Sequence, residues 1–221
     1  DTINGGAGTD SLILSAAWTV VDADFTNITN VETLSYGNNA GTLTLGAASM
    51  AAGIVTITDG TGVTTMTVGA GHTSALTVAL STGNDSITGS ASAAALTVTA
   101  AQDSLTTDDT IVGGSGSSDS LNITGGGTAL AAADMSGVTG METFLAVTNA
   151  ALAVTTHDDN VVAGGTMTVN AAALTSTVFT FTGSNETDGT FTVTTGGTGA
   201  HIIILGNGSD TYTSTNTAGV N

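Results

Sequence analysis

The chain carries many acidic side chains and no basic ones, and this imbalance limits every fold it can adopt. Its 221 residues include 18 Asp and Glu but no Lys or Arg, so the formal net charge is -18. No carboxylate can therefore form a salt bridge to Lys or Arg within the chain. Carboxylates that folding brings together repel one another, and burying one alone costs several kcal/mol or forces its protonation. The missing positive charge must come from solution, and a divalent cation is its natural source.

The same composition excludes several classes of partner. A chain without cationic side chains lacks the groups that usually bind phosphate, so we expect no nucleic-acid or anionic-membrane partner. No apolar run is long enough to span a bilayer, so we expect no membrane insertion. The absence of Cys excludes disulfides. A bound metal ion remains as the candidate for a strong local clamp.

Short stretches in which apolar residues alternate with Thr recur along the chain. Alternation of this kind buries one face of a strand and exposes Thr on the other. The stretches are separated by Gly, Asn, Asp and Ser and recur about every ten to thirteen residues, the spacing of a sandwich, barrel or solenoid. Clear examples are 42–45, 55–58, 76–78, 96–99, 167–169, 178–181 and 191–193. Together with 31 Gly and no Pro, this pattern predicts an all-β fold.

A longer internal repeat indicates tandem organisation. Residues 1–12 return as 109–121 with one insertion, and 23–34 match 133–144, at an offset of about 110 residues. We therefore predict two β-rich repeat units, 1–108 and 109–221, in an elongated β-solenoid, a β-roll-like fold or a tandem array. Because the chain starts within one motif copy and stops just after another, we expect it to be a segment of a longer polypeptide.

The repeated segment contains a glycine-rich motif that is associated with calcium. Residues Gly5–Leu12 fit the pattern GGxGxDxU, and Asp1 lies nine residues before Asp10, where a preceding copy would place its Asp. Gly permits turns with positive φ and exposes carbonyl oxygens, while Asp residues from successive turns can bracket a hard cation. We therefore expect the turns of the β-fold to bind calcium.

Further copies of the motif lie at 83–89, 109–121 and 206–212. Clusters of Gly, Asn and Asp also form ordinary turns, and this alternative stays open. The predicted metal-binding residues are Asp1, Asn4, Gly5, Gly6, Gly8, Asp10, Asn84, Asp85, Asp108, Asp109, Gly113, Gly114, Gly116, Asp119, Asn207, Gly208 and Asp210.

These motifs resemble the RTX class of secreted calcium-binding proteins. The segments Asn30–Leu34 and Gly140–Phe144 also resemble a GVETL-like element of Gram-negative surface-layer (S-layer) proteins. The resemblance implies type I secretion, an extracellular location on the cell surface, calcium binding and assembly into lattices. The sequence departs from the RTX pattern because it lacks long nonapeptide arrays and carries the insertion at Ser117–Ser118. Isolated calcium clamps between β-rich repeats therefore fit better than a long regular β-roll.

Other polar and apolar patterns have more than one interpretation. Glu32 and Glu142 recur at matching positions, either as calcium ligands or lattice contacts or, as we favour, as caps for backbone amides at a corner. The three histidines have no paired metal-ligand spacing, so we expect surface or turn positions for them. They are His72, His157 and His201. Apolar residues spaced by three at 25–31 and 135–141 allow a short helix, although we prefer an apolar ladder at solenoid corners.

Taken together, the sequence predicts a structural protein and not an enzyme. Calcium would draw neighbouring repeats together and make the chain competent for self-association into a surface layer or lattice, with cell-surface polysaccharide bound through another domain. The alternatives are the stalk of a large RTX adhesin, an extracellular filament, or part of a secreted β-helical enzyme. Nothing in the sequence converges on catalysis, because there is no nucleophile elbow, no metalloprotease motif and no cationic side chain.

The absence of Lys and Arg predicts complete resistance to trypsin, even when the chain is unfolded in urea. Gel electrophoresis after digestion should show the intact chain, whereas chymotrypsin should degrade the same unfolded sample at its aromatic residues. A tryptic fragment would contradict this prediction.

Overall fold

The computed structural model shows a parallel β-solenoid, which confirms the predicted all-β solenoid fold. It describes residues 1–215. The described residues form about nine parallel coils and contain very little helix, 8%. It divides into two compact units: residues 1–98 with 109–119 form unit 1, and residues 99–108 with 120–221 form unit 2. The predicted repeat boundary at Asp108 concerns sequence similarity and stays a prediction.

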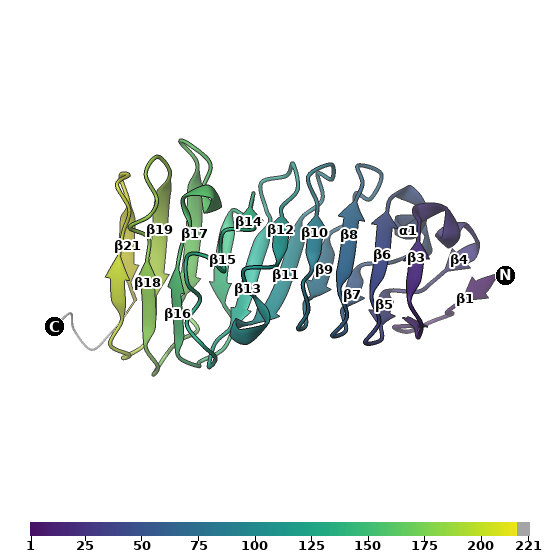
Figure 1. Cartoon of the computed structure of the whole chain (residues 1–221), viewed down its shortest axis with the longest axis horizontal. Helices are drawn as coiled ribbons and strands as arrows, with labels where there is room; N and C mark the ends of the chain where they lie inside the picture. The colour runs from purple at the N-terminus through teal and green to yellow at the C-terminus, as the bar shows by residue number, and fades with distance from the viewer. Residues whose placement is uncertain (216–221) are drawn as a thin grey trace. The chain divides into compact units, whose positions relative to one another are not determined.

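Unit 1 consists of two main parallel sheets to which successive coils contribute alternate strands (Figure 1). One sheet contains β2 (Ser11–Leu14), β5 (Thr33–Tyr36), β7 (Thr56–Thr58), β9 (Leu76–Ala79) and the start of β11 (Leu96–Ala101). The other contains β3 (Trp18–Val20), β6 (Gly41–Leu45), β8 (Thr64–Val68), β10 (Ser86–Thr88) and β12 (Thr110–Val112). A short pair, β1 (Ile3–Asn4) and β4 (Ile28–Thr29), accompanies them.

Unit 2 repeats this arrangement with its own strands. One sheet contains β13 (Ser120–Thr124), β15 (Thr143–Ala146), β17 (Thr166–Ala171), β19 (Thr190–Thr195) and β21 (Thr211–Ser214). Three strands form a second sheet: β16 (Leu152–Thr155), β18 (Phe179–Thr182) and β20 (Ile202–Ile204). The remaining elements are β14 (Val138–Thr139) and the 3-10 helices η2 (Gln102–Ser104) and η3 (Asp158–Asn160).

The length of one coil explains the periodicity of the sequence. In unit 1, Thr33 pairs with Thr56 and Thr56 with Thr77, so equivalent positions lie 23 and 21 residues apart. Each coil contributes two strands, and this halves the interval to the spacing that the alternating stretches predict. Because each strand pairs with the equivalent strands of the preceding and following coils, the coils are held together by local contacts between neighbours.

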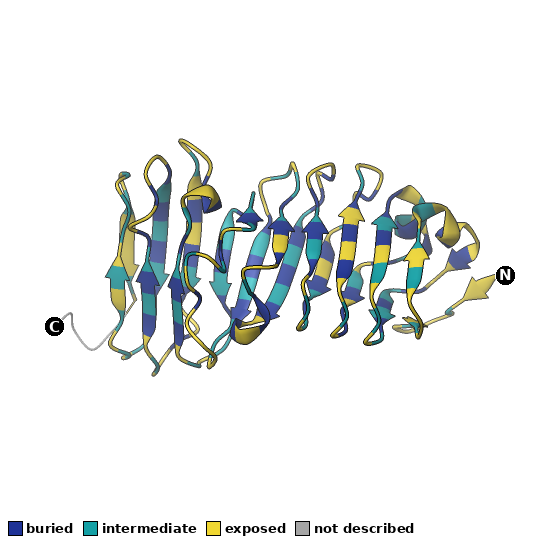
Figure 2. Cartoon of the chain, viewed as in Figure 1, coloured by how far each residue is buried: buried dark blue, intermediate teal, exposed yellow. Residues whose placement is uncertain are grey.

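Alternation places one face of every strand in the core. In one sheet of unit 1, Leu43, Met66, Ile87 and Ile111 are each at most 1% exposed and stand in register on successive strands. Each such side chain stabilises the fold by about 1.5–3 kcal/mol relative to an exposed one. Figure 2 shows the resulting bands, in which buried residues alternate with exposed or half-exposed ones along the strands.

The apolar residues spaced by three are buried, and the first of them lies in a short helix. Residues Asp22–Asn27 form the 3-10 helix η1, which contains Phe25, so the short-helix alternative holds for this part of the segment. Phe25, Ile28 and Val31 are buried, with at most 9% of each residue exposed. The Asp24 carboxylate accepts the Val21 N–H at 2.9 Å and so starts the helix. The one α-helix in residues 1–215, α1 (Ala47–Ala52), follows in unit 1.

Within residues 1–215, no helix is both long enough and apolar enough to cross a bilayer.

Candidate metal centre in the Gly-Asp turns

Acidic side chains in unit 1 connect successive coils by accepting backbone hydrogen bonds. The Thr64 N–H donates to Asp85 Oδ1 at 2.7 Å, and the Asp85 N–H donates in turn to Asp109 Oδ1 at 2.8 Å. Asp85 is 1% exposed and Asp109 is 2% exposed. The predicted ligands Asp85 and Asp109 are thus brought into contact, and both lie in the interior at coil junctions.

A buried carboxyl pair adjoins this chain of hydrogen bonds. The carboxyl groups of Asp59 and Asp85 lie close enough to influence each other's pKa. The Thr64 hydroxyl also donates to Asp59 Oδ1 at 2.8 Å. Asp59 is only 9% exposed, and Oδ2 of both aspartates and the Tyr36 hydroxyl are buried without a hydrogen-bond partner. Tyr36, Asp59, Thr64 and Asp85 line a cavity of about 10 Å³, roughly the space that one water molecule needs.

Burial controls the charge of this pair. It is the largest cause that raises the pKa of Asp85 to about 7, and the nearby carboxylates of Asp59 and Asp109 raise it further. Burial also raises the pKa of Asp59. Two carboxylates in contact cannot both ionise without strong repulsion, so the pair holds a proton or requires a cation. Asp59 and Tyr36 were missed at the sequence level, where the only signal was the Asp59-Gly60 turn after a strand.

The first Gly-Asp turn is organised by side-chain and backbone hydrogen bonds. Asn4 Oδ1 accepts the Gly6 N–H at 3.1 Å and an Asn30 Nδ2–H at 2.8 Å. Gly6 and Gly8 have φ values of 98° and 121°, which only Gly adopts readily. Asp1 is exposed, whereas Asp10 is half-buried and its Oδ2 lacks a hydrogen-bond partner.

Glu32 also contributes to the hydrogen bonds of this corner. Glu32 Oε2 accepts the Asp10 N–H at 2.8 Å, one coil earlier in the chain. The interpretation of Glu32 as a cap for a backbone amide at a corner is therefore confirmed.

The second turn uses Asp119 in the same way. Asp119 is fully buried; its Oδ1 accepts the Leu96 N–H at 2.7 Å and its Oδ2 accepts the Gly114 N–H at 2.6 Å. A Cβ on Gly114 would lie 2.6 Å from the Ser92 carbonyl oxygen, so the close approach of coils requires Gly there. The exposed Asp108 and the turn residues Gly113 and Gly116 complete this segment.

The remaining copies follow the same principle. In unit 2, Asp210 Oδ1 accepts the Phe191 N–H at 2.7 Å, and Asn207 donates its N–H to the Glu186 carbonyl at 3.2 Å. Gly208 packs against the backbone of Gly189, where a Cβ would clash. In unit 1, Asn84 is exposed next to the buried Asp85.

Four of the carboxylates that the sequence analysis assigned to metal make coil-to-coil hydrogen bonds: Asp85, Asp109, Asp119 and Asp210. Among residues 1–215, no three His, Cys, Asp or Glu side chains converge in a geometry that would hold a metal ion. The buried carboxylate oxygens without a hydrogen-bond partner are Oδ2 of Asp10, Asp59 and Asp85 and Oε2 of Glu186. Calcium binding stays a prediction, and these are the atoms through which the described residues could contact a cation.

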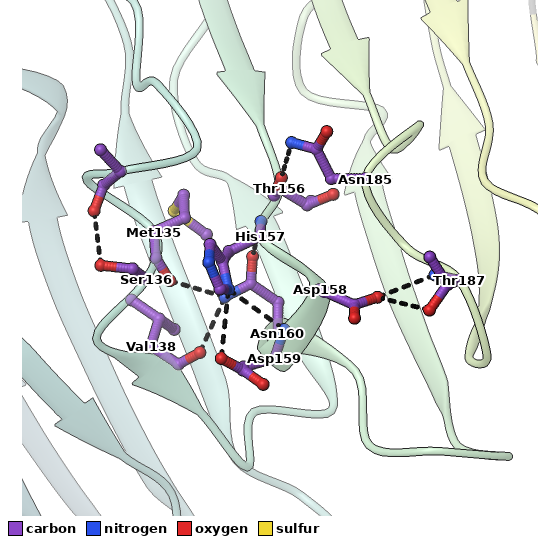
Figure 3. A network of polar contacts seen from close by, with 11 residues as sticks. Met135, Ser136, Val138, Thr156, His157, Asp158, Asp159, Asn160, Asn185 and Thr187 are labelled. Atoms are coloured by element: carbon purple, nitrogen blue, oxygen red, sulfur yellow. Dashed lines mark hydrogen bonds and ion pairs between the residues drawn. The ribbon is translucent and has the colours of Figure 1, made fainter.

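The corner at His157–Asn160 in unit 2 is a hydrogen-bonded cap (Figure 3). The Asn160 side chain donates from Nδ2 to the carbonyls of Met135 and Val138, both at 2.7 Å, and accepts the His157 N–H at 2.7 Å. Asp158 Oδ1 accepts both the N–H and the hydroxyl of Thr187 at 2.9 and 3.0 Å. Asn160 and Asp158 thus connect this corner to the preceding and the following coil.

The other histidines also make backbone contacts. His72 is fully buried, and its Nε2 lies 3.0 Å from the Ile54 carbonyl oxygen. The His72 N–H donates to the Gly69 carbonyl at 3.0 Å, so His72 occupies a turn, as expected, although its ring is buried. In unit 2, His201 Nδ1 accepts the Phe179 N–H at 3.2 Å, the same kind of contact that the aspartates make.

A hollow in unit 2 is bordered by two carboxylates that bind the local backbone. It measures about 220 Å³ and is lined in part by Asp103 and Asp134. Asp103 accepts the Thr128 N–H at 2.6 Å, which lowers its pKa, and Asp134 accepts the Ala131 N–H at 2.8 Å. Each carboxylate is thus used to fix the local backbone.

Comparisons with known proteins do not assign the chain to a family. No family model, no curated protein and no solved structure matches it.

The Asp59–Asp85 pair predicts a pH-dependent stability. The folded-state pKa of Asp85 lies above its unfolded value of 3.8, so its contribution is fully present below that value and is lost as pH rises through about 7. In chelator, the free energy of unfolding from urea titrations should fall between pH ~4 and ~7 by on the order of one to a few kcal/mol.

The variant Asp59→Asn should remove most of this fall, because an amide can donate to an ionised Asp85 without sharing a proton. Asp188→Asn, at an exposed position, provides the matched control and should keep the wild-type pH profile. An unchanged profile in Asp59→Asn would show that the pair does not hold the proton.

The Asn160 network predicts a large local contribution to stability. Asn160→Ala removes three hydrogen bonds and leaves the Met135 carbonyl with only the Val138 N–H as donor, so the free energy of unfolding should fall by about 2–4 kcal/mol. Asn185→Ala removes a single 2.9 Å bond to the Thr156 carbonyl at an exposed position and should cost less than half as much. Equal losses in urea titrations of the two variants would contradict this assignment.

Proposed function

We propose that this protein is a calcium-stabilised structural building block of an extracellular surface layer or cell-surface lattice, and that it is not an enzyme. The observation that carries the proposal is the buried Asp59–Asp85 pair, with unpartnered oxygens, in a chain that has no Lys or Arg. A cation from solution is the only charge besides a proton that can neutralise this pair.

The fold supports a structural role. Parallel coils contact only their neighbours, so stability grows by repetition and the stack presents long regular surfaces. The polar side chains of the Gly-Asp turns are directed at backbone groups of adjacent coils, as the contacts of Asp85, Asp119 and Asp210 illustrate. In this proposal the protein reaches the cell surface by type I secretion, associates with itself, and contacts cell-surface polysaccharide through another domain.

Calcium would act by linkage between binding and folding. Oδ2 of Asp59, Asp85 and Asp10, and Oε2 of Glu186 in unit 2, are the candidate donors. Calcium that binds the folded chain but not the unfolded chain stabilises it by RT ln(1 + [Ca²⁺]/Kd). Extracellular calcium modules have Kd values of about 0.1–1 mM, so one site at tenfold excess contributes about 1.4 kcal/mol.

The proposal is tested by thermal unfolding and light scattering in calcium and in excess chelator. Calcium should raise Tm by about 3–6 °C for each site held at tenfold excess, and particle size should increase. Magnesium at the same concentration should have a smaller effect, because it demands octahedral geometry and retains its water. A well-folded monomer with the same Tm in calcium and chelator would overturn the proposal.

Two variants locate the effect within the chain. The double variant Asp59→Asn/Asp85→Asn should lose the calcium-dependent part of the Tm increase that the buried pair provides, and Asp10→Asn the part provided by the first turn. Asp188→Asn should respond to calcium as the wild type does. An unreduced calcium response in both the double variant and Asp10→Asn would place the ion elsewhere.

A further inference from the structure

One outer face of unit 1 carries hydroxyl groups in strict register. On the sheet of β3, β6, β8, β10 and β12, one outward column of side chains is Thr or Ser on every strand. This first column is Thr19, Thr42, Thr65, Ser86 and Thr110. A second column two residues further along the strands is Thr44, Thr67 and Thr88, and it ends at Val112 on β12. We refer to these eight residues as the hydroxyl grid.

The core fixes the positions of the grid. Between the two columns stand Leu43, Met66 and Ile87, which are at most 1% exposed. A change of strand register by one residue would expose these apolar side chains, so the outward positions are strongly determined. Figure 2 shows exposed and half-exposed bands alternating with buried ones on β6, β8 and β10. Neighbouring hydroxyls are therefore spaced about 4.7–4.9 Å across strands and about 6.6 Å along them.

The grid is uncharged although the chain is strongly acidic. The five strands contain no Asp, Glu or His. The two acids that directly precede β10 and β12, Asp85 and Asp109, are turned into the interior. A face of this kind presents only methyl groups and hydroxyls, and the grid residues range from half-exposed to exposed, as Thr44 and Thr65 illustrate.

This chemistry selects the kind of partner. An uncharged grid has no ion-pair partner for a charged macromolecule. Polysaccharide surfaces are usually bound by aromatic rings, and the aromatic residue of these strands, Trp18, is half-buried and stacked on Tyr36 with ring centroids 4.3 Å apart. The remaining kind of partner is a flat lattice of uncharged hydrogen-bonding groups that repeats in two dimensions. The prism face of hexagonal ice repeats on a comparable scale. We propose that the hydroxyl grid is an ice-binding surface.

The other sheet of unit 1 provides an internal contrast. Its outward column Ser11, Thr33, Thr56 and Thr77 also carries hydroxyls. Its second column keeps only two hydroxyls, Ser35 and Thr58, because Ile13 and Ala79 stand at its two ends. This shorter array of hydroxyls should bind ice more weakly than the grid.

The test uses the whole chain in ice-affinity partition and in ice-recrystallisation assays. The wild type should enter growing ice and keep ice grains small, whereas Thr65→Tyr, which places a bulky ring at the centre of the grid, should lose most of both activities. Thr65→Val keeps the shape and removes one hydroxyl, so it should lose less. Thr77→Tyr on the contrasting face should behave as the wild type, and thermal unfolding of each sample verifies that the variants fold.

Three results would overturn the inference. The first is exclusion of the folded wild type from ice, and the second is an equal loss of activity in Thr65→Tyr and Thr77→Tyr. The third is a dimer in light scattering that Thr65→Tyr dissociates without any partition into ice, because the grid would then be an interface with a second copy. The inference does not rest on calcium. If the folded chain still partitions into ice in chelator, the ice-binding inference holds independently of the calcium-dependent function proposed above.

Discussion

Backbone N–H groups at the corners of a parallel solenoid lie beyond the ends of the strand ladders, and in this chain carboxylates accept several of them. A buried N–H without a partner costs about as much as a lost hydrogen bond, so each corner needs an acceptor. Asp85, Asp119 and Asp210 fill this role for the coil that precedes them in the chain, and Glu32 does so at the first turn. Hydrogen bonds to an ionised acceptor are also stronger than neutral ones. The acidity of the chain is thus part of how its coils are joined.

This solution has a limit where two carboxylates meet. Asp119 accepts two backbone N–H groups, which disperse its charge. Asp59 and Asp85 instead contact each other in the interior, and their Oδ2 atoms have no donor. Without Lys or Arg, the chain can relieve this conflict only with a proton or a cation from solution. The same composition that supplies acceptors at every corner makes the fold sensitive to its ionic environment.

The outer faces show the opposite distribution of polarity. Turning acids such as Asp109 inward at the corners leaves the strands themselves to uncharged residues, and Thr fits an exposed strand position because its branched side chain favours β structure. Repetition of coils with matching register then converts a local preference into columns such as Thr42, Thr65 and Ser86. Regular polar surfaces are therefore a direct consequence of coil stacking.

The sequence by itself determined the all-β solenoid, the inward and outward alternation of residues such as Leu43 and Thr42, and the corner role of Glu32. These features are local, because strand alternation has a period of two and a capping acid is signalled by its place before a strand. Only the tertiary structure placed Asp59 against Asp85, 26 residues later, and turned His72 inward. Such contacts depend on which positions of successive coils are superimposed. Coil length varies with each loop, from 19 residues between Thr192 and Thr211 to 27 between Leu152 and Phe179, so no fixed sequence interval predicts them.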